Sequence, residues 1–96
     1  MYAQFLTFQM GPGKRAAAEK MADDFNLLHK GLKGYKNAIY LGNDTTGEYG
    51  SLSIWETPED IKSAAEILQP ELEKALQGIA DGAPAVHVFE IYEPKS

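Results

Sequence analysis

The sequence predicts one α+β domain, residues 1–96, in which two helices cover one face of an antiparallel sheet. Its length of 96 residues suits a single domain. Strand-like and helix-like hydrophobic patterns follow one another in the order strand, helix, strand, strand, helix, strand. The strand-like segments are apolar on both of their faces, which is unusual for a sheet with one face in water.

The composition argues against several classes of protein. Nine basic residues against fourteen acidic residues give a net charge of −5, which repels nucleic-acid phosphates. Without cysteine the chain forms neither disulfides nor cysteine-bound metal sites, and its two distant histidines make no metal-ligand pattern. No apolar run approaches the roughly 18 residues that a membrane span needs. The first residues also lack the basic segment with which a secretory signal begins. We therefore expect a cytoplasmic protein that binds neither nucleic acid nor membrane.

The first predicted strand is Tyr2–Gln9, which is rich in aromatic and β-favouring residues and closes at Gly11-Pro12-Gly13. From residue 14 to residue 32 the apolar side chains recur at steps of three and four, which predicts an amphipathic helix with one buried stripe. That stripe consists of Ala17, Met21, Phe25, Leu28 and Leu32.

A hairpin is predicted next. Its strands, Tyr35–Leu41 and Tyr49–Trp55, are joined by the turn-forming residues 42–47.

The second helix is predicted to begin at Thr57, which suits the N-cap, followed by Pro58 at the first helical position. Its apolar face continues to Ile79, and we expect Pro70 to kink the helix or to divide it in two. The last strand is Ala85–Tyr92. Right-handed crossovers place both helices on one face of the sheet, which is the ferredoxin-like βαββαβ arrangement.

Side-chain alternation indicates a surface that these helices do not cover. In the last strand, Val86 and Val88 oppose His87 and Phe89, so both faces carry apolar groups. An exposed apolar face of this size is rare in soluble monomers. We therefore expect a homodimer in which two bare sheet faces meet; the alternative is ordinary strand amphipathicity in a monomer.

Trp55, the only tryptophan, shares its strand face with Tyr49, Ser51 and Ser53. A large ring beside small neighbours, under the helices, predicts a cavity lined by apolar groups with a few polar tips. The alternative is a core tryptophan whose indole N–H binds a backbone acceptor.

The stretch SLSIWETPED at residues 51–60, the final strand VHVFEIYEP and the Gly-containing loop after the first strand resemble the antibiotic biosynthesis monooxygenase family of dimeric α+β barrels. The resemblance covers nearly the whole chain. It implies a homodimer joined through the sheets and a pocket between helices and sheet. It also implies cofactor-independent oxygenation of a small planar aromatic substrate, such as a phenol, an anthrone or a quinol.

The haem-degrading branch of that family is similar to this chain only at Trp55. That branch places a haem-ligating histidine on the second helix, where residues 59–79 have none, and an asparagine on the first strand, where residues 2–10 have none. Without the axial ligand the iron has no fixed position. We expect no haem and no other cofactor.

For cofactor-independent oxygenation the protein must bind the substrate in a dry pocket, remove a proton and stabilise the anion. We predict that Trp55 and Phe25 form apolar walls and that His29 accepts the proton. His29 and Trp55 are the predicted catalytic residues, and Phe25, Tyr49 and Ser53 are the predicted substrate-binding residues. Tyr40 and Asn37 are further candidates for orienting a phenol.

Each histidine also has an alternative interpretation without a role in chemistry. His29 would then be a partly exposed surface residue, and His87 an interface residue of the dimer. The loop Gly11–Arg15 would be an anion site only in an acylphosphatase-like protein, and its glycine spacing differs from that pattern. The rival to the enzyme is a non-catalytic dimeric barrel that binds a small molecule or regulates a partner.

Overall fold

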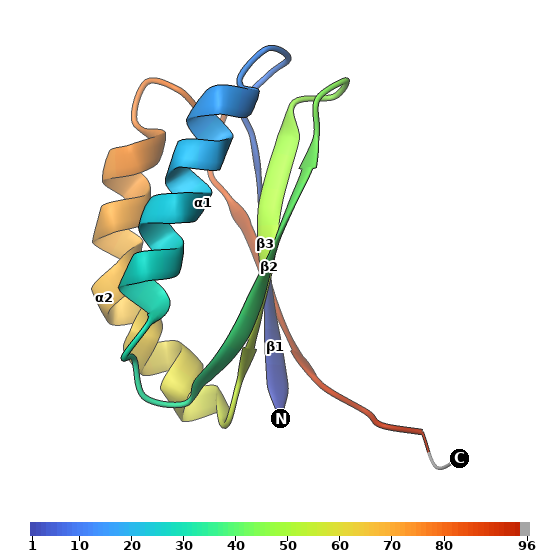
Figure 1. The fold of residues 1–96 in the computed structure, drawn as a ribbon, viewed down its shortest axis with the longest axis vertical. Helices are drawn as coiled ribbons and strands as arrows, with labels where there is room; N and C mark the ends of the chain where they lie inside the picture. The colour runs from blue at the N-terminus through green and yellow to red at the C-terminus, as the bar shows by residue number, and fades with distance from the viewer. Residues whose placement is uncertain (95–96) are drawn as a thin grey trace.

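The computed structural model describes residues 1–94 of the chain. Its elements are β1 Tyr2–Gln9, α1 Arg15–His29, β2 Tyr35–Asn43, β3 Glu48–Trp55, α2 Pro58–Leu76 and β4 Ala85–Glu90. The four strands form one antiparallel sheet in the order β2-β3-β1-β4. Both helices lie on the same side of this sheet and leave its other side bare (Figure 1). The predicted ferredoxin-like α+β fold is confirmed. None of the helices described is both long and apolar enough to cross a membrane.

Several element boundaries differ from the prediction by one to three residues: β2 ends at Asn43, β3 begins at Glu48, α2 ends at Leu76 and β4 ends at Glu90. α1 ends at His29, three residues before the expected end, because Lys30 turns to an extended backbone and Gly31 takes a φ of 87°. α2 runs unbroken through Pro70, so the expectation of a two-piece helix is wrong. Pro70 lies on the exposed side of α2, where water can hydrate the carbonyl group that the missing N–H leaves free.

The start of α2 places Trp55 in the core. The Thr57 hydroxyl accepts a hydrogen bond from the backbone N–H of Asp60 at 3.1 Å, and Pro58 occupies the first helical position. Ile61 and Ala64, one and two turns into the helix, then pack on Trp55, whose side chain is fully buried. This small core lies where α1 ends and α2 begins.

The uncovered face of the sheet is apolar. Phe5 of β1 lies opposite Leu52 of β3, and Leu52 lies opposite Ile39 of β2. Ile39 and Phe89 are 50% and 55% exposed in the single chain. The alternation seen in the sequence therefore corresponds to a real face, which one chain leaves in contact with water.

Candidate functional site

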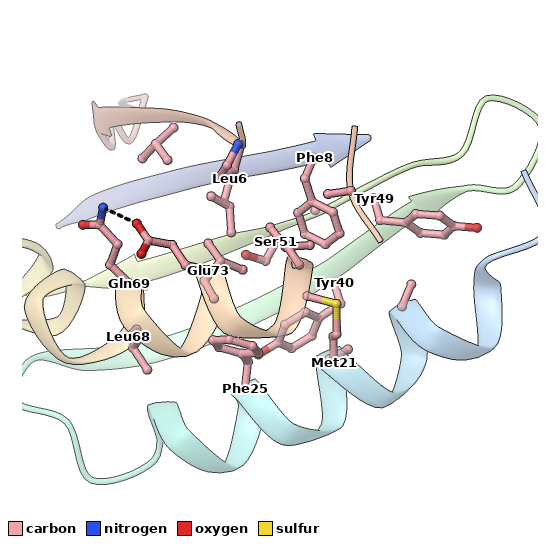
Figure 2. Close-up of a pocket in the computed structure, with 18 of the residues that line it drawn as sticks. Leu6, Phe8, Met21, Phe25, Tyr40, Tyr49, Ser51, Leu68, Gln69 and Glu73 are labelled. Atoms are coloured by element: carbon pink, nitrogen blue, oxygen red, sulfur yellow. Dashed lines mark hydrogen bonds between the residues drawn. The ribbon is translucent and has the colours of Figure 1, made fainter. Parts of the chain in front are cut away.

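A cavity of about 710 Å³ lies between the helices and the sheet (Figure 2). Its walls are mainly apolar and come from β1, α1 and α2: Leu6, Phe8, Met21, Phe25, Leu68 and Leu72. Its floor on β3 is made of small residues, Gly50, Ser51 and Ser53, where larger side chains would fill the space. This volume is within the range of small-molecule sites in proteins.

Four of the five predicted site residues line this cavity, and Trp55 does not. His29, Phe25, Tyr49 and Ser53 are lining residues. Trp55 is fully buried in the core beside Ile61 and Ala64, so the prediction that it forms a wall of the pocket is wrong. β3 ends at Trp55, and at that end of the sheet the first turns of α2 fill the space that would otherwise be open.

Trp55 does not line the cavity, but it contacts two residues that do, Ser53 and His29. Its indole N–H donates to the Ser53 hydroxyl at 2.8 Å, and that hydroxyl is 3.5 Å from the Gln4 carbonyl oxygen, to which it donates. Its ring lies 5.8 Å from the ring of His29 and 5.5 Å from that of Tyr35, centroid to centroid. The indole therefore binds a side-chain hydroxyl where a backbone acceptor was the expected alternative.

His29 is buried, with 7% of its surface exposed, so the interpretation as a surface histidine is wrong. Its Nδ1 atom lies 2.7 Å from the Phe25 carbonyl oxygen. A carbonyl only accepts hydrogen bonds, so Nδ1 must carry the proton, and the lone pair of the neutral ring is on Nε2. The ring also stacks on Tyr35 at 5.3 Å.

Burial lowers the pKa of His29 below its ordinary value of 6.5, and the hydrogen bond to the Phe25 carbonyl opposes this only in part. The imidazole is therefore neutral at pH 7. No buried side-chain nitrogen or oxygen within residues 1–94 lacks a hydrogen-bond partner. The only bonds of His29 are made by Nδ1, so Nε2 retains access to solvent and can accept a proton.

Tyr40 lies beside His29 in the cavity wall. Its hydroxyl oxygen is 3.5 Å from Nδ1 of His29, which already donates to Phe25. Burial raises the pKa of Tyr40 to about 12, so its hydroxyl stays protonated at neutral pH and can donate to a ligand. The sequence indicated Tyr40 as a candidate for orienting a phenol, but its nearness to His29 was not predicted.

The polar groups of the other candidate residues are less available to a ligand. The Tyr49 ring lines the cavity, but its hydroxyl donates to Asp44 at 3.0 Å and turns away from Met21 and Phe25 (Figure 2). The Ser53 hydroxyl is occupied by Trp55. Asn37 is exposed and does not line the cavity.

His87 and the loop before α1 lie outside the site. His87 sits on the uncovered sheet face, where its ring stacks on Phe89 at 6.1 Å. The Arg15 guanidinium makes ion pairs with Glu19 at 3.1 Å and Asp44 at 3.0 Å. Within residues 1–94, no group of three or more His, Cys, Asp or Glu is arranged to hold a metal ion.

Sequence reasoning missed a polar pair on α2. Gln69 and Glu73 both line the cavity, and the Gln69 amide donates to the Glu73 carboxylate at 3.3 Å (Figure 2). They follow the same four-residue spacing as the apolar cavity residues Leu68 and Leu72, one position further along the helix. This position, next to the apolar cavity residues on the helix, is the sequence signal that could have identified the pair.

Comparison with known proteins bears on the fold. No protein-family model and no curated protein matches the chain by sequence. A monooxygenase of Streptomyces coelicolor, solved with nanaomycin D, is 17% identical, with a TM-score of 0.79 over 99% of this chain and 90% of its own. An antibiotic biosynthesis monooxygenase family protein of Caulobacter crescentus is 20% identical, with a TM-score of 0.78 over 96% of this chain and 90% of its own. SnoaB, a cofactor-independent oxygenase of Streptomyces nogalater, is 14% identical, with a TM-score of 0.74 over 97% of this chain and 95% of its own. The chain has the fold of the antibiotic biosynthesis monooxygenase family along nearly its whole length.

Proposed function

We propose that this protein is a cofactor-independent monooxygenase that oxidises a planar aromatic phenol, anthrone or quinol inside the cavity. The observation that carries the proposal is His29. It is a buried, neutral histidine whose Nδ1 is held by the Phe25 carbonyl, in the wall of a large and mainly apolar cavity. Proteins of the same fold include a monooxygenase and a cofactor-independent oxygenase, which supports the reaction class.

Each part of the site has a role in this chemistry. Phe25, Met21 and Phe8 provide apolar surface against which a flat ring system can lie. Nε2 of His29 accepts a proton from the substrate, and the resulting anion is electron-rich enough to reduce dioxygen without a metal or flavin. The Tyr40 hydroxyl, which stays protonated, donates a hydrogen bond to the oxygen on which negative charge develops.

The reaction balances without another reductant. For an anthrone, the ring CH₂ carbon loses a proton to His29, and the carbanion gives an electron pair to dioxygen, forming a C–O bond. The peroxide formed then loses its second C–H proton and breaks its O–O bond, which leaves a quinone carbonyl and releases one water molecule. Both electron pairs come from the substrate, and His29 returns its proton to the departing oxygen.

The proposed assembly is a homodimer through the uncovered sheet face. Ile39, Leu52, Phe5 and Phe89 make that face apolar, and it lies on the opposite side of the sheet from the cavity. Mainly apolar faces of this kind commonly form the interfaces of twofold dimers.

Oxygen uptake tests the function. We expect the wild type to consume oxygen with an anthrone faster than buffer alone. His29→Asn should lose this excess at least tenfold, because asparagine can keep a donor near the Phe25 carbonyl but has no group at the position of Nε2. His87→Asn makes the same change at the other histidine, outside the cavity, and should keep the rate.

Equal oxygen uptake by His29→Asn and wild type, with both folded, would refute the role of His29. Tight binding of the anthrone without any oxygen uptake by the wild type would instead favour the non-catalytic binding protein.

A further inference from the structure

The cavity has a second polar end, at Glu73 on α2, which lines the cavity while remaining exposed to solvent. Its distance from the proposed reaction centre follows from helix geometry. Ala64, which packs on Trp55 close to His29, precedes Glu73 by nine residues on the continuous helix α2. At 1.5 Å rise per residue these two positions are about 13 Å apart along the axis. A ligand of several fused rings with one end at His29 would therefore reach towards Glu73.

The described cavity lining contains an acidic side chain but no Lys or Arg. Its titratable residues are His29, Tyr40, Tyr49 and Glu73. His29 is neutral for the reason given above, and both tyrosines keep their protons because their pKa values are raised, mainly by burial. Glu73 is the one acidic side chain among the described lining residues.

The hydrogen-bonding atoms that Gln69 and Glu73 leave free are mainly acceptors, beside the second amide N–H of Gln69. The Gln69 amide NH₂ donates to one carboxylate oxygen of Glu73 at 3.3 Å, which sets the orientation of the amide. The amide oxygen of Gln69 and the second carboxylate oxygen of Glu73 remain available. Both side chains project from α2 towards the sheet side of the cavity (Figure 2). A ligand group that donates hydrogen bonds fits here, and an anionic group is repelled.

We propose that Glu73, with Gln69, makes the cavity selective for aromatic substrates that carry a neutral or cationic hydrogen-bond donor, such as an amino or hydroxyl group, at the end far from His29. Aromatic carboxylates and phosphates are discriminated against at the same position. This inference rests on the proposed function, because it assumes that the cavity holds a flat aromatic molecule. It adds the substrate class that the site selects.

Three probes with one ring system test the selectivity. Anthraquinones that carry an aminomethyl, a hydroxymethyl or a carboxylate group at the same ring position differ mainly in the charge and donor character of that group. Isothermal titration calorimetry gives the dissociation constant of each probe. We expect wild type to bind the aminomethyl compound about three- to tenfold more tightly than the carboxylate, with a ratio that shrinks as salt is added.

Two variants locate the effect. Glu73→Gln should bring the aminomethyl and carboxylate probes close to equal affinity, while the hydroxymethyl compound changes least. Glu66→Gln removes the same charge from an exposed position of α2 that does not line the cavity. It should keep the wild-type ratio, because the effect belongs to one position and not to the net charge of −5.

The results separate two kinds of failure. If the carboxylate binds wild type as tightly as the aminomethyl compound, or if Glu66→Gln equalises the probes as Glu73→Gln does, the selectivity is wrong while the aromatic site stands. If none of the three probes binds wild type, the aromatic site fails, and the selectivity fails with it.

Discussion

The proposed dimer makes a quantitative prediction for Phe89→Ala. Phe89 lies on the uncovered face of β4 and is 55% exposed in the single chain. A phenylalanine side chain offers about 200 Å² of surface, so about 110 Å² is available to a partner, worth about 2.5 kcal/mol at about 25 cal/mol per Å². A twofold interface contains the residue twice, so the truncation should cost about 3–5 kcal/mol and raise the dimer dissociation constant roughly 150- to 4,000-fold.

Sedimentation equilibrium over a series of protein concentrations measures that constant. Ile67→Ala is the matched control, because Ile67 on α2 is 56% exposed but lies on the helical side of the sheet. It should leave association unchanged. A wild-type species of 10.6 kDa at micromolar concentration would refute the dimer. Equal association of Phe89→Ala and wild type, with circular dichroism showing both folded, would refute the assignment of the interface to this face.

Three further predictions concern the site and the helix that supports it. The rate of oxygenation should fall on acidification with a midpoint below pH 6.5, because burial lowers the pKa of His29 and the neutral ring is lost as the pH falls through that value; a midpoint above 6.5 would contradict the lowered pKa. Ser53→Ala should lower the free energy of unfolding in urea by about 1–3 kcal/mol, because the buried indole N–H of Trp55 loses its acceptor, whereas Ser51→Ala, which removes no such bond, should change it by under about 0.5 kcal/mol. Thr57→Ala should cost about 1 kcal/mol in the same measurement through loss of the α2 cap, and an unchanged unfolding midpoint would show that the cap is dispensable.

Local signals in the sequence predicted the elements well. β1 ends as predicted because Gly11 and Gly13 adopt φ values of 85° and 83°, which turn the chain away from the sheet. The Thr57-Pro58 pair likewise marked the start of α2 to the residue. The error at Pro70 has a physical cause, since a proline on the wet side of a helix loses one hydrogen bond without burying the carbonyl that it frees.

The candidate site was less predictable, because it depends on contacts between elements. Hydrophobicity ranks Leu28 above His29, yet Leu28 is 41% exposed and His29 is buried. The imidazole gains the Phe25 carbonyl and two aromatic rings as partners, and none of these contacts is visible in the period of the helix. Alternation assigned Trp55 to the correct face of β3, but its depth along the sheet depends on where α2 begins.

The cavity and the uncovered face are connected by an energetic argument. On β3, Ser51 and Ser53 point beneath the helices and leave much of that space empty, while Leu52 between them points to the bare face. A monomer of this size buries a smaller fraction of its surface than a large domain does, and a hollow beneath its helices reduces the buried apolar area further. The buried cluster of Trp55, Ile61 and Ala64 is accordingly small and lies at one end of the sheet. In the proposed dimer, burial of the opposite face by a second chain offsets that loss without filling the cavity, because side chains that alternate along a strand contribute to one face only.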